Sequence, residues 1–344
     1  MNDTIIEAVF AWEALDSRGN PTVAAEVTLR GGARGTATVP SGASTGTYEA
    51  RELRDGGTRY GGKGVRAAVA AANGALARAV RGIDAGKQEL VDAALRDADG
   101  TPALSRLGSN AVLAISVASA LAAAQAAGQP LYRAAAPENS AVILPLPMVN
   151  IISGGAHAGR SLDIQDLLVM PVGAESFAEA IEMAWRVRRG TAAALDARGL
   201  PSALVADEGG LGPAQPSNRS ALEALYDGIE RAGLTPGDDA AIAIDVAANQ
   251  FYDPTTGHYR LALDTRELQA GEWIAELAEW CRNFPIVSIE DPLADRDWAV
   301  LALEVFRWPA KVGAVDRRLG EAVGVDHPAA GSHQPPEPPV QTSA

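Results

Sequence analysis

The stretches IAIDVAANQFYD at 242–253 and IVSIEDPL at 286–293 decide the fold of this chain. Each begins with a short apolar run typical of a buried strand, and an acidic residue, Asp245 or Glu290, stands where that run ends. A helical stretch separates the two runs, as in barrels whose parallel strands alternate with helices. Because such a barrel gathers its catalytic side chains at the carboxyl ends of its strands, we expect Asp245 and Glu290 to lie at one site.

A third acidic residue, Glu208, lies in the run ADEGG at 206–210 and is expected at the same site. The residues alone leave a second interpretation open for all three acids. An acid after a strand is often a turn or helix cap, and an Asp-Glu-Gly-Gly sequence can form a solvated turn. The pattern favours a shared carboxylate site without excluding three unrelated caps.

The order of the expected elements predicts two domains. In residues 1–137 strands come first and helices second, which is the α+β pattern, and the strands form a three-stranded antiparallel meander. We expect these strands at 5–12, 22–30 and 34–40, and helices at 63–81, 86–98 and 109–127. In residues 138–306 strands and helices alternate, which predicts a β/α barrel of the TIM type. Its strands lie in 142–152, 162–172, 242–247 and 286–290, and its helices at 177–198, 218–232, 266–282 and 297–306.

The predicted barrel is incomplete. The second half of the chain supplies about four of the eight strands that a closed barrel needs. Residues 307–344 hold several prolines and few large apolar residues, so we expect a divergent and largely disordered tail there. The abrupt change of character near residue 299 suggests a C-terminal truncation or a shift of the reading frame.

The composition limits which binding partners and which cellular compartment we expect for this protein. A formal net charge of -14 over 344 residues argues against binding to nucleic acid or to anionic membranes, because both are negatively charged. Cys281 is the only cysteine, so no intrachain disulfide forms, and the N-terminus lacks the basic and apolar regions of a signal peptide. The longest apolar run, 111–127, falls short of a membrane span. We expect a cytoplasmic protein with a small-molecule substrate.

Seven motifs together resemble one family. They are DSRGNPTV (16–23), PSGASTGTYEA (40–50), SGGAHAG (153–159), DIQDLLVMPVGA (163–174), ADEGG, IDVAANQFYD (244–253) and SIEDPLADRDW (288–298). In this order, over about residues 5–299, they resemble enolase, the phosphopyruvate hydratase of glycolysis. The resemblance implies a Mg²⁺-dependent lyase that removes the proton next to the carboxylate of 2-phosphoglycerate and then the 3-hydroxyl, giving phosphoenolpyruvate. It also implies a homodimer.

The same resemblance implies a role for each candidate residue. Asp245 and Glu290 would be ligands of the tighter Mg²⁺, Ser44 a ligand of a second Mg²⁺, Glu208 the general acid, and His157 and Asp166 further parts of the substrate pocket with Glu208. Without the resemblance, His157 could be a solvent-facing residue of a Gly-rich loop. Ser44 could belong to a flexible linker, a phosphate-binding loop or a mobile lid.

Departures from the family pattern leave two functions open. Asp166 stands where the family has glutamate, Ser153 replaces an asparagine, and no match is found for the third metal-binding aspartate, the lysine base, the Ser-His-Arg loop or the second lysine. Lys311 is the only lysine after the barrel begins. The chain is thus expected to be either an active enolase-type lyase or a catalytically inactive relative that serves as a binding or dimerising module. A related acid/base enzyme with another carboxylate substrate fits the GASTG loop less well.

Overall fold

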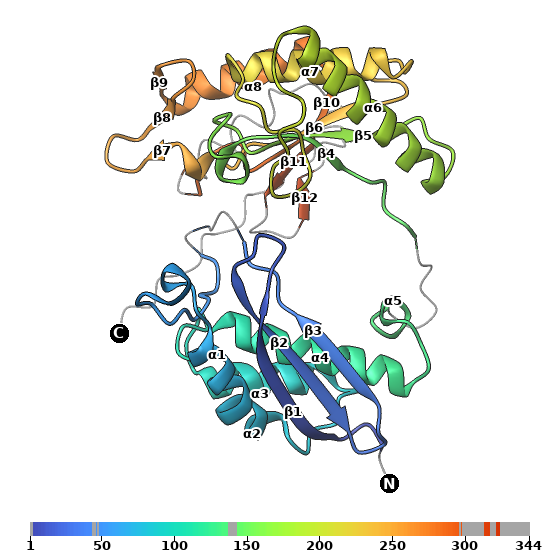
Figure 1. The fold of residues 1–344 in the computed structure, drawn as a ribbon, viewed down its shortest axis with the longest axis vertical. Coiled ribbons are helices and arrows are strands. Elements are labelled where there is room, and N and C mark those ends of the chain that lie inside the picture. Colours follow the sequence, from blue (N-terminus) through green and yellow to red (C-terminus); the bar gives the residue numbers. More distant parts are fainter. Residues whose placement is uncertain are drawn as a thin grey trace, which may run out of the picture.

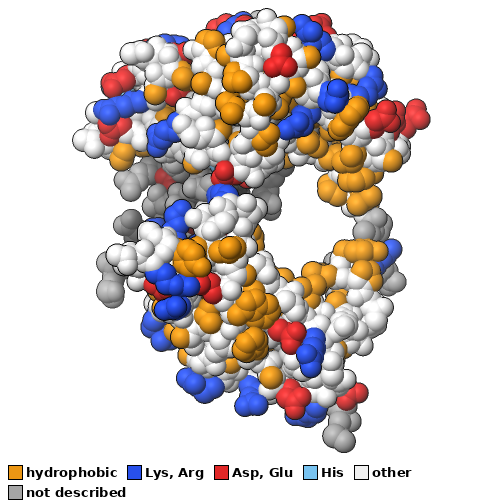
Figure 2. Space-filling model, in the orientation of Figure 1, with side chains coloured by type: hydrophobic (Ala, Val, Ile, Leu, Met, Phe, Trp, Pro, Cys, Tyr) orange, Lys and Arg blue, Asp and Glu red, His pale blue; other side chains and the backbone are white. Residues whose placement is uncertain are grey.

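The computed structural model describes residues 3–42, 46, 48–136, 143–295, 297, 313–316 and 321–323. These residues form two lobes, the first from β1 to α5 and the second from β4 onward (Figure 1). An open space lies between the lobes in the space-filling view (Figure 2). The predicted domain bounds, 1–137, 138–306 and 307–344, stay predictions.

The first lobe is an antiparallel sheet packed against helices, as expected. Its strand order is β1-β2-β3. The strands are β1 (Ile6–Leu15), β2 (Pro21–Leu29) and β3 (Arg34–Thr38), and the helices are α1 (Arg66–Ala71), α2 (Ala77–Val80), α3 (Gln88–Asp99), α4 (Ser109–Ala126) and α5 (Leu131–Ala134). Short 3₁₀ and π segments lie at Arg59–Gly62 and Ala72–Leu76. The α+β prediction for this part of the chain is confirmed.

Small residues let the sheet approach α4 closely. A Cβ on Gly35 of β3 would lie 2.2 Å from the carbonyl oxygen of Ala118 and 2.3 Å from the nitrogen of Ala122. Real Cβ atoms do not come so near to backbone, so only glycine fits between this strand and this helix. The alanines of α4 serve the same purpose on the other side of the contact, and the sheet and helix bury their apolar faces against each other.

One predicted helix is interrupted. The expected helix at 63–81 consists of α1, the π segment and α2, because Asn73 within the π segment binds the edge strand β1. Its side chain donates to the carbonyl of Ala11 at 2.8 Å and accepts from the nitrogen of Ala11 at 2.9 Å. A helical register that widens by one residue turns this amide toward the sheet. It pairs backbone groups that an edge strand would otherwise leave open.

Helix α4 is long and apolar enough to cross a membrane, and it is the one such helix in the part of the chain that the structure describes. Half of it is buried inside the protein. It packs against β2 and β3 and contributes Ile115, among others, to the core of the first lobe. The run was expected to fall short of a membrane span, whereas α4 is long enough by length and composition; in this structure it is a core helix of the first lobe.

The second lobe contains a six-stranded sheet in the order β12-β11-β10-β6-β5-β4. Its strands are β4 (Val149–Ser153), β5 (Asp166–Met170), β6 (Ala241–Asp245), β10 (Ile286–Glu290), β11 (Gly313–Asp316) and β12 (Glu321–Val323). Helices α6 (Phe177–Ala197), α7 (Asn218–Arg231) and α8 (Ala270–Asn283) cover one face of this sheet (Figure 1). A small second sheet holds β7 (Tyr252–Asp253), β8 (His258–Leu261) and β9 (Arg266–Leu268). Over the described residues the barrel is incomplete, as predicted.

The strand directions differ from the expected parallel alternation. Strands β4, β6, β10 and β11 run in one direction, whereas β5 is antiparallel to both of its neighbours. Strand β5 is reversed because residues 154–165 join β4 and β5 as a hairpin, whereas parallel strands need a crossover helix. The amino end of β5 therefore lies beside the carboxyl ends of β4 and β6.

Other predicted boundaries also need correction. The helix expected at 266–282 begins only at Ala270, because Gln269 and Glu272 form a capping box there and residues 266–268 pair as β9. The expected disordered tail contains β11 and β12, which extend the sheet beyond β10. The expected helix at 297–306 and most of the tail lie outside the described residues.

Candidate active site

A single row of paired residues crosses the second sheet at the strand ends. Ser153 of β4 pairs with Asp166 of β5, Asp166 pairs with Asp245 of β6, and Asp245 pairs with Glu290 of β10. Directly paired residues on adjacent strands place their side chains on the same face, about 5 Å apart at Cβ. Three carboxylates thus stand next to one another. The structure brings Asp245 and Glu290 together, as the sequence predicted.

This row is electrostatically costly for the folded chain. Asp166 and Asp245 are buried, and like charges in directly paired positions repel each other. Carboxylate oxygens are also the ligands that Mg²⁺ prefers, and a divalent cation would offset the repulsion. The donor set of Asp245 and Glu290 therefore fits the metal that was expected on family resemblance.

Two glutamines hold Asp245 in place. The side-chain nitrogen of Gln165 donates to Oδ2 of Asp245 at 2.9 Å, and the side-chain nitrogen of Gln250 donates to the side-chain oxygen of Gln165. The side-chain oxygen of Gln250 in turn accepts from the backbone nitrogen of Ala156 at 2.8 Å. This chain of amides links the turn that carries His157 to Asp245. Sequence reasoning missed both glutamines, although each lies within a quoted motif.

His157 and Glu208 meet beside the carboxylate row. His157 lies in the short 3₁₀ segment Gly155–Ala158 and is buried. Its Nδ1 is 3.2 Å from Oε1 of Glu208 and 4.0 Å from Oδ2 of Asp166. One potential ligand atom from each of the three residues lies within 4.8 Å of the others. The group can share a proton or bind a positively charged partner.

Burial shifts the acidity of Asp166. Desolvation raises the pKa of its carboxyl to about 6, although hydrogen bonds from Ser153 and Asn150 and the nearby His157 act in the opposite direction. The side-chain nitrogen of Asn150 donates to Oδ1 of Asp166 at 2.5 Å, and the charge of Glu208 raises the pKa further. A carboxyl with a pKa near 6 can gain or lose a proton close to neutral pH.

A tight turn presents Glu208 to this group. Within residues 206–210 the backbone nitrogen of Gly209 donates to the carbonyl of Ala206 at 3.0 Å, and Gly209 has a φ of +85°. That conformation favours glycine, which explains the glycine directly after the acid. The Glu208 side chain is 54% exposed, so its outer part faces solvent while Oε1 faces His157.

Arginines from both lobes fix this turn. Arg188 of α6 donates to the carbonyl of Gly209 at 3.0 Å. Arg18, from the turn between β1 and β2 in the first lobe, lies 3.5 Å from Oδ2 of Asp207 and also donates to the carbonyl of Ser41. The first lobe therefore takes part in positioning the loop that carries Glu208.

Two protein families match the chain in the order of its lobes. The family described as "Enolase, N-terminal domain" matches residues 6–134, and the family described as "Enolase, C-terminal TIM barrel domain" matches residues 141–318. The second match alone covers more than half of the chain. The chain belongs to the enolase family.

The enolase match extends further than the motifs indicated. It ends at residue 318, whereas the resemblance judged from motifs ended near residue 299. Within the added part, β11 pairs in parallel with β10, Val315 stands opposite Glu290, and Asp316 ends the strand. A third acid therefore follows the same pattern as Asp245 and Glu290, at the carboxyl end of the next parallel strand. The sequence analysis missed it, although GAVD repeats the apolar-then-acid order of IAID.

Two predicted residues of this enolase-family chain remain without a structural account. Ser44 and Lys311 both lie outside the described residues. The predicted role of Ser44 as a ligand of a second Mg²⁺ stays a prediction. The structure places His157, Asp166, Glu208, Asp245 and Glu290 at the same end of the second sheet.

Proposed function

We propose that this chain is a lyase that removes water from 2-phosphoglycerate to give phosphoenolpyruvate in the cytoplasm, with Mg²⁺ as its cofactor. One observation carries the proposal. Asp166, Asp245 and Glu290 stand in one row across three adjacent strands, with His157 and Glu208 beside Asp166. A reaction that adds a second negative charge to a carboxylate needs such a site, where a divalent cation is held by hard oxygen ligands.

Asp245 and Glu290 would hold the principal Mg²⁺, and Ser44 would be a ligand of a second one. Bound Mg²⁺ supplies the positive charge that stabilises the substrate carboxylate as the proton at the adjacent carbon is removed. The chain of Gln165 and Gln250 keeps Asp245 oriented for this task.

Glu208 would protonate the departing hydroxyl. Loss of the 3-hydroxyl as water requires one proton, and a carboxyl group held near the substrate can supply it. Oε1 of Glu208 lies 3.2 Å from Nδ1 of His157, a buried nitrogen that has no hydrogen-bond partner among the described residues. Asp166 lies beside both groups, and its own buried carboxyl has a pKa raised to about 6 by desolvation.

Turnover by the purified chain tests this proposal. With 2-phosphoglycerate and Mg²⁺, enolpyruvate formation would be followed by ultraviolet absorbance, and Mg²⁺ binding would be measured separately by calorimetric titration. The proposal expects both turnover and Mg²⁺ binding, and it expects Asp245→Asn to weaken both. Mg²⁺ binding without turnover would refute the lyase activity while keeping the metal site.

The second candidate function is a catalytically inactive enolase relative that works as a binding or dimerising module. Of the three lysines, Lys63 and Lys87 lie in the first lobe, so no described lysine lies at the carboxylate row. An apolar stripe on α6 favours a binding role, because Phe177, Ile181 and Trp185 are about half exposed and share one helix face.

We propose a homodimer under both functions, supported by this α6 stripe. Trp185→Glu is expected to convert the dimer to a monomer, because a charge would be buried against apolar surface. Analytical ultracentrifugation would measure the mass of the chain and of the variant. Leu90→Glu is the matched control, since Leu90 is an equally exposed leucine on α3. A monomeric unmodified chain would refute the dimer.

A further inference from the structure

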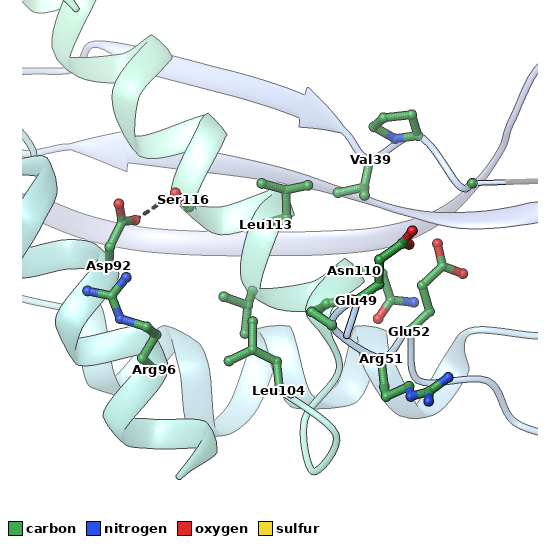
Figure 3. Close-up of a pocket in the computed structure, with 15 residues that line it drawn as sticks. Val39, Glu49, Arg51, Glu52, Asp92, Arg96, Leu104, Asn110, Leu113 and Ser116 are labelled. Carbon is green, nitrogen blue, oxygen red and sulfur yellow. Dashed lines mark hydrogen bonds between the residues drawn. The ribbon is translucent and has the colours of Figure 1, made fainter. Parts of the chain in front are cut away.

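The first lobe contains a cavity that the proposed reaction does not use. Its volume is about 600 Å³, within the usual range of small-molecule sites. The residues that directly follow β3, residues 49–52, α3 and the first half of α4 form its walls (Figure 3). None of the residues of the carboxylate row lines it, so it is a separate site from the candidate active site.

The cavity has an apolar middle flanked by two arginines. Val39 and Val112 are buried in its wall, and Leu104 and Leu113 add apolar surface. Figure 3 places Leu104 and Leu113 between Arg96 of α3 and Arg51. An apolar wall with a few charged groups is the usual composition of a ligand site.

The carboxylates around the cavity already have donors from the protein. Each of the three accepts at least one hydrogen bond of normal length. The donors are Arg54 for Glu52 at 3.0 Å, Ser116 and Gln88 for Asp92 at 2.7 Å and 2.9 Å, and the backbone nitrogen of Gly46 for Glu49 at 2.8 Å. These acids therefore have little remaining need for a cationic ligand.

Arg51 and Arg96, unlike these carboxylates, have no side-chain partner among the described residues. Within the described part of the chain, the guanidinium groups of Arg51 and Arg96 form neither an ion pair nor a side-chain hydrogen bond. Each guanidinium has five N–H donors and no acceptor. The unmet hydrogen-bonding capacity of the cavity is thus of donor type, which suits a carboxylate or another oxyanion.

We propose that this cavity binds a small molecule that carries one anionic oxygen group on an apolar body. The anionic group pairs with Arg96, and the apolar body lies against Leu104 and Leu113. Residues 39–42 and 49–52 contribute to the walls and precede and follow Ser44 in the chain. A ligand in the cavity touches both flanks of the segment that carries Ser44.

Three probes with the same ring and different charge test the proposal on the full chain. Saturation-transfer NMR titrations would compare benzoate, benzyl alcohol and benzylamine. Benzoate is expected to bind most tightly, and added salt is expected to weaken it because the arginines are exposed. Arg96→Gln is expected to weaken benzoate by about tenfold through loss of a charge-assisted hydrogen bond. Leu113→Trp, which fills the apolar middle, is expected to block it.

Arg78→Gln is the matched control, because Arg78 is an exposed arginine on α2 that does not line the cavity. Its benzoate affinity should equal that of the unmodified chain. Circular dichroism would show that the variants are folded. The proposal is overturned if benzyl alcohol or benzylamine binds as tightly as benzoate. It is equally overturned if Arg96→Gln and Leu113→Trp both leave benzoate binding unchanged.

Discussion

Two buried aspartates, one in each lobe, have pKa values that are shifted in opposite directions. Asp99 in the first lobe and Asp166 in the second are both almost fully removed from solvent. Burial raises the pKa of Asp99, but hydrogen bonds from Thr101, Leu107 and Arg106 outweigh it and hold the pKa below its usual range. Burial raises the pKa of Asp166 to about 6, and its hydrogen bonds do not compensate. The difference lies both in the donors that each lobe supplies and in the deeper burial of the surroundings of Asp166.

This contrast separates structural acids from candidate functional acids. In the first lobe Glu13 also has a lowered pKa, because Arg59 donates to it. Such acids stabilise the fold in their ionised form. In the second lobe the acids stand beside one another, and burial of Asp166 favours the protonated form. A site that must accept a cation or transfer a proton needs acids of this second kind.

The largest expected effect concerns the acid beside Asp166. Under the proposed lyase function, Glu208→Gln should lower turnover about 100- to 10,000-fold, because it removes the proton for the departing hydroxyl. The rate of enolpyruvate formation measures this. Glu230→Gln on α7 is the control and should keep the full rate, since Glu230 is exposed and far from the row in sequence. A rate for Glu208→Gln within threefold of the unmodified chain would exclude Glu208 as the acid.

The second-largest expected effect is a loss of stability when Asp99 of the first lobe is replaced. Asp99 accepts from the backbone nitrogens of Leu107 at 2.7 Å and Thr101 at 3.0 Å. Asp99→Asn places an amide N–H against one of these backbone N–H donors. It should lower the free energy of unfolding by about 2–4 kcal/mol. Hydrogen exchange of α3 and α4 peptides measures the loss. Asp97→Asn, an exposed neighbour, should cost far less. Equal losses in the two variants would contradict the role of Asp99.

The stability contributed by the candidate functional aspartate, Asp166, should depend on pH with the opposite sign. Asp166 has a pKa of about 6 in the folded chain against 3.8 for the free side chain, so the folded chain binds more protons between these values. The free energy of unfolding of the metal-free chain should therefore fall as pH rises from about 4 to about 6, by roughly 2–3 kcal/mol. Asp166→Asn should remove this fall.

Thermal unfolding of the metal-free chain and of Asp166→Asn, measured from pH 4 to pH 7, gives the comparison. The variant should gain stability relative to the unmodified chain as pH rises. Asp238→Asn, at an exposed position, should track the unmodified chain at every pH. Parallel curves for Asp166→Asn and the unmodified chain would show that Asp166 titrates normally.

The smallest effect concerns the groups that hold Asp166. A Cβ on Gly210 would lie 2.5 Å from Oγ of Ser153 and 2.6 Å from Oδ1 of Asn150, the two side chains that hydrogen-bond to Asp166. Gly210→Ala should displace these two side chains and lower the free energy of unfolding by about 1–2 kcal/mol. The midpoint of thermal unfolding measures this. Gly212→Ala meets only ordinary contacts of 3.4 Å and should be nearly neutral. Similar midpoints for both variants would contradict this account.

Local sequence signals predicted most elements but not their directions. Strand β10 has the predicted bounds, because Pro285 and the Asp291-Pro292 pair delimit its apolar run. The reversal of β5 could not be predicted, since an apolar run of five residues has the same composition in either direction. Strand β11 was missed because GAVD is shorter than a typical strand and lies among glycines and charges.

The sequence predicted that the acids lie close together, but it did not predict the amide side chains that bind them. Glu208, Asp245 and Glu290 were expected together, because acids at strand ends follow a simple positional rule. Gln165, Gln250 and Asn150 follow no such rule, and their partners depend on how distant segments pack. The raised pKa of Asp166 depends on burial and on donor geometry, which composition does not contain.

The reversal of β5 makes one continuous peptide responsible for a whole side of the site. Because β4 and β5 form a hairpin, residues 153–166 carry Ser153, His157 and Asp166 without an intervening α-helix. This segment could be exchanged as a unit between related proteins, with only its two strands to match in register. Directed evolution confined to this peptide would explore the chemistry of the site while leaving α6, α7 and α8 untouched.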